Sequence, residues 1–508
     1  MFRTASCVLV VLGVVFASGT VSAGPTGSRP TVRLSVTEKP LGVLLPGFII
    51  ETLTASPDGR RVGYIVSNKD GTVGPVIDGV VGKAGDAYVK GGPLFSPDGK
   101  RWAAGIVRKG KYVPVIDGVD GDPCDNVSGL TWSPDGQRLA FAARGGAKSW
   151  VVVNGKKGQE YEAIAPKSLL FSPDGKRFAY LARRDGKTIV VLDHQESKPY
   201  TQATDLRFSP DGKRFAYLAV RVPSDMVFVI DGVEGKSYKG ASVGSLRFSP
   251  DSKRVGYVVP SDKGAVAVVD GVEGKPCDGF AADSPQFSPD SKRVVCSYKR
   301  GDVWFFSIDG VESEGHEGIM TGNPVFSPDG SRVACAVGDH GVWHVIVDGK
   351  PGAPFDGIMA QTPVFSPDGK RVAFGAKHKD QWVVVADGAE GKGYDRLNAP
   401  LFSPDGRRMA YVAKRADGWV VVLDGRESGP FVGVFEKGTR FTPDSKHLVA
   451  WVTPQDGMSR IYVDSVDFRV NRGLMIGAGI VFDGPRSFHA PAARGEQIAL
   501  VQVEIAEP

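Results

Sequence analysis

The stretch FSPDGKRFAYLA, residues 171–182, sets the fold that we expect for this chain. Two apolar segments flank a Pro-Asp-Gly turn at residues 173–175. Proline presets φ at the second turn position, aspartate can bond its own backbone, and glycine accepts a positive φ. The stretch therefore predicts two short β-strands joined by a tight turn.

The same turn recurs along the chain as Ser-Pro-Asp-Gly or a close variant. Its prolines are Pro57, Pro97, Pro134, Pro173, Pro210, Pro250, Pro289, Pro328, Pro367, Pro404 and Pro443. In the unit at 401–423, apolar segments at 401–403, 408–413 and 419–423 predict three strands, and an edge strand can follow Asp424-Gly425. Four strands in about 40 residues are typical of one β-propeller blade. We expect a degenerate twelfth copy near Phe488.

Residues 171–182 and 365–376 (FSPDGKRVAFGA) resemble the WD40-like PD40 repeats of the TolB-type β-propellers. The resemblance extends over roughly residues 45–505. It implies an all-β propeller with a role at a bacterial envelope through protein partners. The motif itself is structural, and it also occurs in peptidase propellers, so it does not define an activity.

Eleven or twelve blades exceed the 4–8 that are typical of one propeller. We therefore expect two tandem six-bladed rings, residues 45–283 and 284–508, after an N-terminal extension at 24–44. The spacing of the repeats stays regular at the boundary, so a single very large ring or a seven-plus-five division remains open. The segment from Pro30 to Glu51 and the strand around 498–505 are candidates for a closing strand.

Residues 1–23 have the pattern of a secretory signal. Arg3 precedes the apolar core VLVVLGVVFA at 8–17, and Val21-Ser22-Ala23 offers small residues for cleavage near Ala23. We expect a secreted or periplasmic bacterial protein. No later segment approaches the roughly 20 apolar residues that a membrane-spanning helix needs.

Composition narrows the partners and cofactors. A formal net charge of +5 on 508 residues, without a recognisable nucleic-acid module, argues against a nucleic-acid partner. Four cysteines follow the signal: Cys124, Cys277, Cys296 and Cys335. They show no zinc spacing, so we expect buried apolar side chains, no metal and no cofactor.

The loops between the second and third strands are mostly basic. Candidate binding cations are Arg183, Arg184, Lys299, Arg300, Lys414 and Arg415. Because hairpin turns alternate between the two faces of a blade, these loops should give one face a positive potential. We place the turn aspartates on the other face, together with Glu234, Glu273, Glu312 and Glu390. An acidic protein or an anionic envelope polysaccharide would suit the basic face; the alternative is a set of solvated loops.

Tryptophan opens the third strand in four consecutive units. These residues are Trp304, Trp343, Trp382 and Trp419. If their rings reach the basic face, they could stack on sugars or peptide side chains. The alternative is that they pack between blades.

Taken together, the sequence favours a non-enzymatic binding or scaffold protein over an enzyme. A purely architectural surface protein is one alternative, and a hydrolase or lyase with a central pocket is another. The central pocket would need polar residues on the innermost strands. Arg207, Arg247 and Gln286, in consecutive units, are the candidates.

Overall fold

The computed structural model describes residues 32–222, 225–322, 324–435, 438–464, 466–470, 473–474 and 479–506. The predicted signal at 1–23 lies outside them. Within these ranges the strands form twelve antiparallel sheets. The helical structure there is of the 3-10 kind alone, at η1 (Pro166–Ser168) and at Gly438. The all-β prediction is confirmed.

Every sheet is a blade with the same strand order from the centre of the ring outward. The inner strands are β2 (Phe48–Ala55), β6 (Ala87–Tyr88) with β7 (Leu94–Phe95), β11 (Asn126–Trp132), β15 (Ala163–Ile164) with β16 (Leu170–Phe171), β20 (Gln202–Phe208), β24 (Arg247–Phe248), β28 (Gly279–Phe280) with β29 (Gln286–Phe287), β33 (Gly318–Ile319) with β34 (Val325–Phe326), β38 (Gly357–Ile358) with β39 (Val364–Phe365), β43 (Arg396–Leu397) with β44 (Leu401–Phe402), β48 (Gly433–Val434) with β49 (Arg440–Phe441), and β53 (Gly473–Leu474) with β54 (Val481–Phe482).

The second strands carry a large share of the buried side chains. They are β3 (Val62–Ser67), β8 (Trp102–Arg108), β12 (Leu139–Gly145), β17 (Phe178–Arg184), β21 (Phe215–Val222), β25 (Val255–Ser261), β30 (Val294–Arg300), β35 (Val333–Asp339), β40 (Val372–His378), β45 (Met409–Arg415), β50 (Leu448–Thr453) and β55 (Ser487–Arg494). The last of these confirms the degenerate twelfth copy.

The third strands are β4 (Val73–Ile77), β9 (Lys111–Ile116), β13 (Lys148–Val153), β18 (Lys187–Leu192), β22 (Asp225–Ile230), β26 (Gly264–Val269), β31 (Val303–Ile308), β36 (Val342–Val347), β41 (Gln381–Ala386), β46 (Gly418–Leu423), β51 (Arg460–Val463) and β56 (Gln497–Ala506). The outer strands are β5 (Val80–Val81), β10 (Val119–Asp120), β14 (Lys156–Tyr161), β19 (Gln195–Glu196), β23 (Val233–Tyr238), β27 (Val272–Glu273), β32 (Val311–Glu312), β37 (Lys350–Pro351), β42 (Ala389–Glu390), β47 (Arg426–Phe431), β52 (Val466–Arg469) and β1 (Arg33–Val43). We number the blades in chain order; the twelfth combines β53–β56 with β1.

Each blade is buried on both faces by its neighbours. In one core cluster, Ala142 and Val151 of the third blade pack with Phe178, Tyr180 and Ile189 of the fourth. A single sheet could not bury two apolar faces alone, so stacking of repeats supplies the core.

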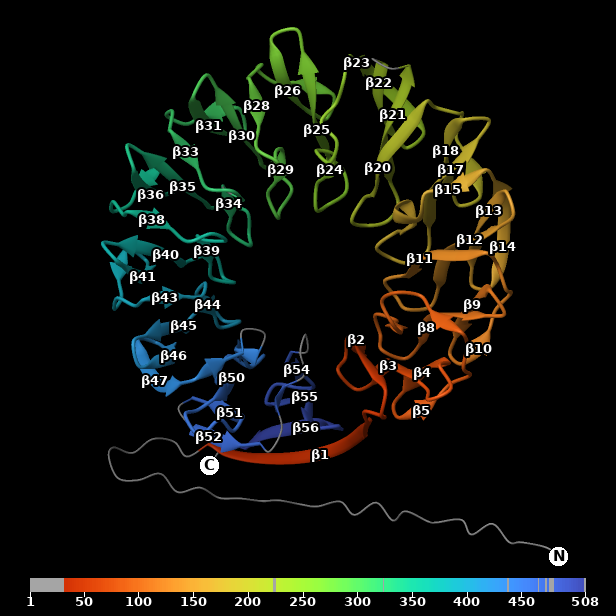
Figure 1. Ribbon diagram of the computed structural model, residues 1–508. Coiled ribbons are helices and arrows are strands. Elements are labelled where there is room, and N and C mark those ends of the chain that lie inside the picture. The colour runs from red at the N-terminus through yellow and green to blue at the C-terminus, as the bar shows by residue number, and fades with distance from the viewer. Residues whose placement is uncertain are drawn as a thin grey trace, which may run out of the picture.

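The twelve blades lie in one ring (Figure 1). The expected two six-bladed rings are therefore replaced by the single large ring that the sequence left open. The sixth and seventh blades, on either side of the predicted ring boundary at residues 283/284, contact each other as other neighbours do. Asp251 N donates to Ser291 Oγ at 2.9 Å, and Arg254 Nη1 donates to Lys292 O at 3.1 Å. The number of blades per ring depends on the tilt between neighbours, which the turn motif does not encode.

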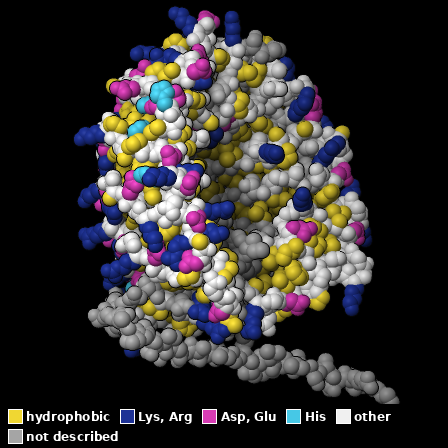
Figure 2. All heavy atoms as spheres, turned by 60° about the vertical axis from the view of Figure 1, so that its left-hand side comes forward, with side chains coloured by type: hydrophobic (Ala, Val, Ile, Leu, Met, Phe, Trp, Pro, Cys, Tyr) yellow, Lys and Arg dark blue, Asp and Glu magenta, His cyan; other side chains and the backbone are white. Residues whose placement is uncertain are grey.

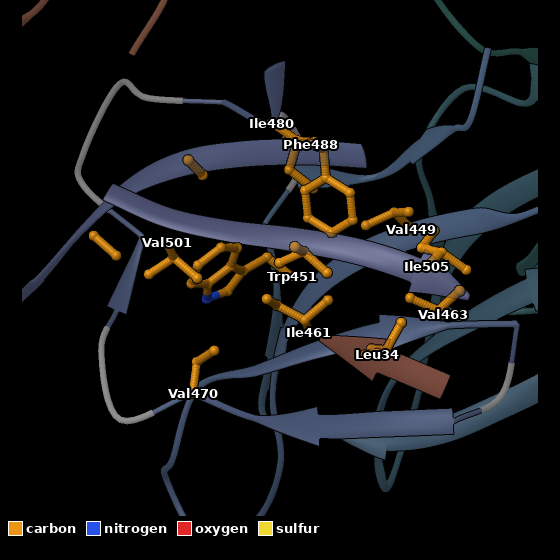
Figure 3. Close-up of a cluster of buried hydrophobic side chains, with 13 residues drawn as sticks. Leu34, Val449, Trp451, Ile461, Val463, Val470, Ile480, Phe488, Val501 and Ile505 are labelled. Atoms are coloured by element: carbon orange, nitrogen blue, oxygen red, sulfur yellow. The ribbon is translucent and has the colours of Figure 1, made fainter. Parts of the chain in front are cut away.

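The first and last described strands close the ring together. β1 pairs antiparallel with β56, from Arg33↔Ala506 to Val43↔Gln497, so both candidate closing strands are used. Leu34 enters a buried cluster with Trp451 and Ile505 (Figure 3).

An arginine just after ten of the eleven turns links a blade to the next, and His447 follows the eleventh turn. Arg177 Nε donates to Asp193 Oδ2 at 2.8 Å, its Nη1 donates to Lys213 O at 2.7 Å, and its guanidinium lies 5.5 Å from the centre of the Phe208 ring. The arginines that stack in this way on the following blade are Arg61, Arg101, Arg138, Arg177, Arg214, Arg254, Arg293, Arg332, Arg371 and Arg408.

The hairpin tips separate onto two faces. One face, the turn face, carries the Ser-Pro-Asp-Gly turns and the turns between the third and outer strands. There the carboxylate of Asp193, in a turn of the second kind, accepts a hydrogen bond at 2.9 Å from Phe178 N, which follows a turn of the first kind. The other face, the loop face, carries the loops between the second and third strands and the segments that enter each blade. There Glu162 Oε1, on an entering segment, accepts a hydrogen bond from Asp185 N of the loop at 2.8 Å.

Candidate binding surfaces of the ring

Carboxylates bind the backbone of several loops on the loop face. Asp86, Glu162, Glu317 and Asp356, each on an entering segment, accept a hydrogen bond from a backbone N–H of the next loop at 2.5–2.8 Å. The donor residues adopt φ of 50–56°, a left-handed conformation that needs such support. The loops therefore present their side chains from a fixed frame.

Several predicted binding cations are already paired. Arg184 Nη1 lies 2.7 Å from Glu196 Oε2, and the Arg184 guanidinium lies 5.0 Å from the centre of the Tyr161 ring. Arg415 contacts Asp417 and Glu427, each at 2.7 Å. These pairs reduce the positive potential that the loop sequence suggests.

Two further predicted cations are also paired. Lys299 Nζ lies 3.2 Å from Asp302 Oδ1, and Arg300 bonds Glu312. The expectation that the glutamates lie apart from the loop cations is thus wrong for Glu312. It is also wrong for Glu234, which lies 3.5 Å from Arg221 Nη1. An arginine side chain is long enough to run along the blade to its outer strand.

Other cations of the loop face project into solvent. Lys109, Arg183, Lys187 and Lys379 are exposed, and no carboxylate of the described residues lies within 4 Å of their charged groups. Of the predicted set, Lys414 lies over the Trp419 ring, 5.8 Å from its centre. Figure 2 shows Lys and Arg side chains around the rim, interspersed with Asp and Glu, and a hollow centre.

The four tryptophans are half-buried, and two of them pack between blades. Trp343 borders a core cluster with Phe355 and Phe374. It also covers Gly338, where a Cβ atom would lie 2.9 Å from Trp343 Cε2, so the indole requires glycine there. Trp419 borders the equivalent cluster two interfaces further on, between the tenth and eleventh blades. Stacking of Trp304 or Trp382 on a ligand stays a prediction.

The predicted central-channel residues lie on β20, β24 and β29 at the inner margin of the ring (Figure 1). Arg207 Nε donates to Asp205 Oδ1 at 3.0 Å, and Asp205 Oδ2 accepts from Gly244 N at 3.0 Å. Arg247 Nη1 donates to Leu246 O at 3.0 Å. Burial and, after it, the charge of Arg207 lower the pKa of Arg247. Gly244 links the two arginines, because its N–H donates to Asp205 and its carbonyl accepts from Arg247. Gln286 is half-buried in the next blade.

Grooves lie between some of the blades, and the sequence did not predict them. One of about 670 Å³ lies between the sixth and seventh blades and is lined by Ala267, Phe280, Cys296 and Tyr298. Equivalent grooves hold about 450 Å³ between the third and fourth blades and about 540 Å³ between the eighth and ninth.

The cysteines help to explain the larger groove. At other interfaces two facing slots hold aromatic rings, such as Tyr161 and Tyr180, with centres 6.3 Å apart. At the sixth–seventh interface the corresponding residues are Cys277 and Cys296, which share one core cluster. Smaller side chains leave more space there.

All four cysteines are free and buried, as the sequence analysis expected. Burial raises the pKa of Cys277 to about 11 and that of Cys296 to about 12. In the described part of the chain, no group of three or more His, Cys, Asp or Glu side chains is placed to hold a metal ion. No helix in that part has the length and apolar composition needed to cross a membrane.

The strand pairings define the class of protein: a twelve-bladed β-propeller closed by its strand β1. This confirms the propeller fold that the PD40 resemblance implied. No protein-family model matches the chain, and neither does any curated protein.

Comparison with solved structures returns distant similarity. A eukaryotic initiation factor is 14% identical with a TM-score of 0.34, over 66% of this chain and 96% of that one. The β-propeller domain of the Trilobed protease from Pyrococcus furiosus is 14% identical with a TM-score of 0.26, over 52% and 94%. TolB from Acinetobacter baumannii is 18% identical with a TM-score of 0.21, over 56% and 80%. At these values the fold assignment rests on the strand pairings themselves.

Proposed function

We propose that the chain is an exported, non-enzymatic binding or scaffold protein of a bacterial envelope, which holds an anionic partner on its loop face. Export is supported by the signal pattern at 1–23. A loop surface on a rigid β-scaffold is a common place for binding residues. The partner is an acidic protein surface or an envelope polysaccharide.

One observation carries the proposal: anchored loops present cations that have no carboxylate partner. Lys109, Arg183, Lys187 and Lys379 extend from three blades, and loops in those blades are fixed by bonds to Asp86, Glu162 and Asp356. Loops that are ordered before binding lose less conformational entropy on binding. Exposed cations also attract an anionic partner from a distance.

The test uses the exported full-length chain, tagged at its C-terminus, to capture material from an envelope extract. The loop variant is K109E/R183E/K187E/K379E. The matched control is K100E/K176E/K253E/K370E, which changes the charge equally on the turn face, where these lysines are 81–82% exposed. We expect the wild type and the control to retain the same material and the loop variant to lose it. Retention should also fall in about 0.5 M salt, because salt screens exposed charges.

Equal retention by all three proteins would overturn the charge argument. No retention above bare beads would favour the architectural alternative. Export is tested separately by fractionating cells that produce the chain with and without residues 1–23. Recovery of both forms in the cytoplasm would contradict it.

A further inference from the structure

The inner wall of the fifth and sixth blades holds two arginines that are linked through the carboxylate of Asp205 and the backbone of Gly244. Asp205 has a side chain that is only 6% exposed, and both of its oxygens are engaged, by Arg207 Nε and by Gly244 N, each at 3.0 Å. Arg247 is anchored to the same loop, because its Nη1 donates to the carbonyls of Gly244 and Leu246. One bonding network therefore fixes both guanidinium groups.

The positive charge of this pair is only partly balanced. Arg207 makes its ion pair through Nε, and its side chain is 41% exposed. Within the described residues, no carboxylate lies within 4 Å of Arg247. The charge of Arg207 contributes to the lowered pKa of Arg247, after burial, which is the larger cause. Two neighbouring cations with N–H donors to spare are suited to an anion.

The pair is not part of the repeated blade architecture. The residue before the inner-strand aromatic is Leu94, Leu170, Val325, Val364 or Leu401 in other blades. Blades form with either apolar or basic residues at this position, so folding does not require arginine there. In the eleventh blade Arg440 occupies it, but Leu401 and Val481 stand at the position in the neighbouring blades. The adjacent pair is confined to Arg207 and Arg247.

We propose that Arg207 and Arg247 form a binding site for an oxyanion, a carboxylate or phosphate group of a ligand that enters the central opening. Guanidinium groups bind both kinds of oxyanion through paired, charge-assisted hydrogen bonds. The site lies on inner strands, away from the loop-face cations. It therefore does not depend on the partner that we propose for the loop face. Gln286 occupies the equivalent register in the seventh blade.

Calorimetric titration of the full chain tests the site, with inorganic phosphate as one probe and citrate as the other. The double variant R207Q/R247Q removes both guanidinium groups. The control K213Q/K253Q removes the same charge from exposed turn lysines of the same two blades. We expect one-to-one binding to the wild type and the control, and at least about tenfold weaker binding to the double variant. Binding of one probe alone also supports the site and identifies the class of ligand.

A second variant keeps the test independent of folding. Asp205→Asn removes the negative charge that competes with the ligand, so it should strengthen binding several-fold. Near-ultraviolet circular dichroism shows which variants keep the native fold. The proposal is overturned if neither probe binds the wild type at about 10 mM. Equal weakening in the control, or unchanged affinity in a folded R207Q/R247Q variant, would overturn it as well.

Discussion

At the residue scale, the arginine that follows ten of the eleven turns joins its blade to the next. Arg371 shows the arrangement: its Nε lies 2.8 Å from Asp387 Oδ2, its Nη1 donates to Arg407 O at 2.9 Å, and its guanidinium lies 5.2 Å from the centre of the Phe402 ring. It thus bonds its own blade and the next at once. The preceding Lys370 is 82% exposed and lies 3.9 Å from Asp368.

We expect Arg371→Ala to lower the free energy of unfolding by about 1–2 kcal/mol, because a carbonyl bond, an ion pair and a ring contact are lost together at a site that is 31% exposed. Lys370→Ala should change it by less than about 0.5 kcal/mol. Urea unfolding followed by tryptophan fluorescence compares the two. Equal shifts in the midpoint would contradict the special role of the arginine.

The turn aspartates should make the fold less stable at low pH. Hydroxyls of Ser327 and Ser331, with the Ser331 N–H, hold the pKa of Asp329 at about 2, below its usual 3.8. Since the folded pKa lies below the unfolded one, this group stabilises the fold above about pH 4, and the contribution is lost as pH falls toward 2. Ser327→Ala should raise the pKa of Asp329, as a carbon-13 NMR titration of the carboxylate can show. A wild-type Asp329 that titrates near 4 would refute this account.

The buried thiols should react slowly. With a pKa of about 11 for Cys277 and about 12 for Cys296, few of these groups are thiolate at pH 8. We expect iodoacetamide to modify them only after unfolding in urea, as peptide mass spectrometry can measure. A K253C variant provides an exposed thiol as an internal standard. Native modification of Cys277 or Cys296 at the rate of that standard would be the contrary result.

At the scale of elements, the sequence predicted the blade well because the turn and the alternating strands are local features. It did not predict that the inner strand is interrupted in most blades, as in β28 and β29, which both pair with β30. That interruption places a loop at the inner wall. Nor could it decide between the N-terminal and C-terminal closing strands; the structure pairs β1 with β56.

The closing strand offers a sharp test, because two of its side chains are buried among exposed and half-buried neighbours. Leu34 and Leu41 are each 8% exposed and lie in two different core clusters, whereas Ser35 is exposed. We expect Leu34→Ala or Leu41→Ala to cost about 2–5 kcal/mol and Ser35→Ala to cost little. Hydrogen exchange should show faster exchange of β56 amides in the leucine variants. Unchanged protection of β56 would mean that β1 does not close the ring.

At the scale of the whole molecule, what the sequence could not predict depends on geometry between repeats. The tilt that places twelve blades in one ring arises from packing such as that of Val151 against Tyr180 and Ile189, which no single repeat displays. The pairing of Arg300 with Glu312 could not be predicted, because the order of the turns shows on which face a loop lies but not how far its side chains reach. Arg207 and Arg247 could be singled out from consecutive repeats, but Asp205, which holds the first of them, could not.

The single ring is the central claim, and electron cryomicroscopy of the full chain tests it most directly. Class averages viewed along the axis should show twelve blades around one opening, with the N-terminal strand on the outer edge of the last blade. Two adjacent rings of six blades, or an open arc whose first and last blades do not meet, would contradict it.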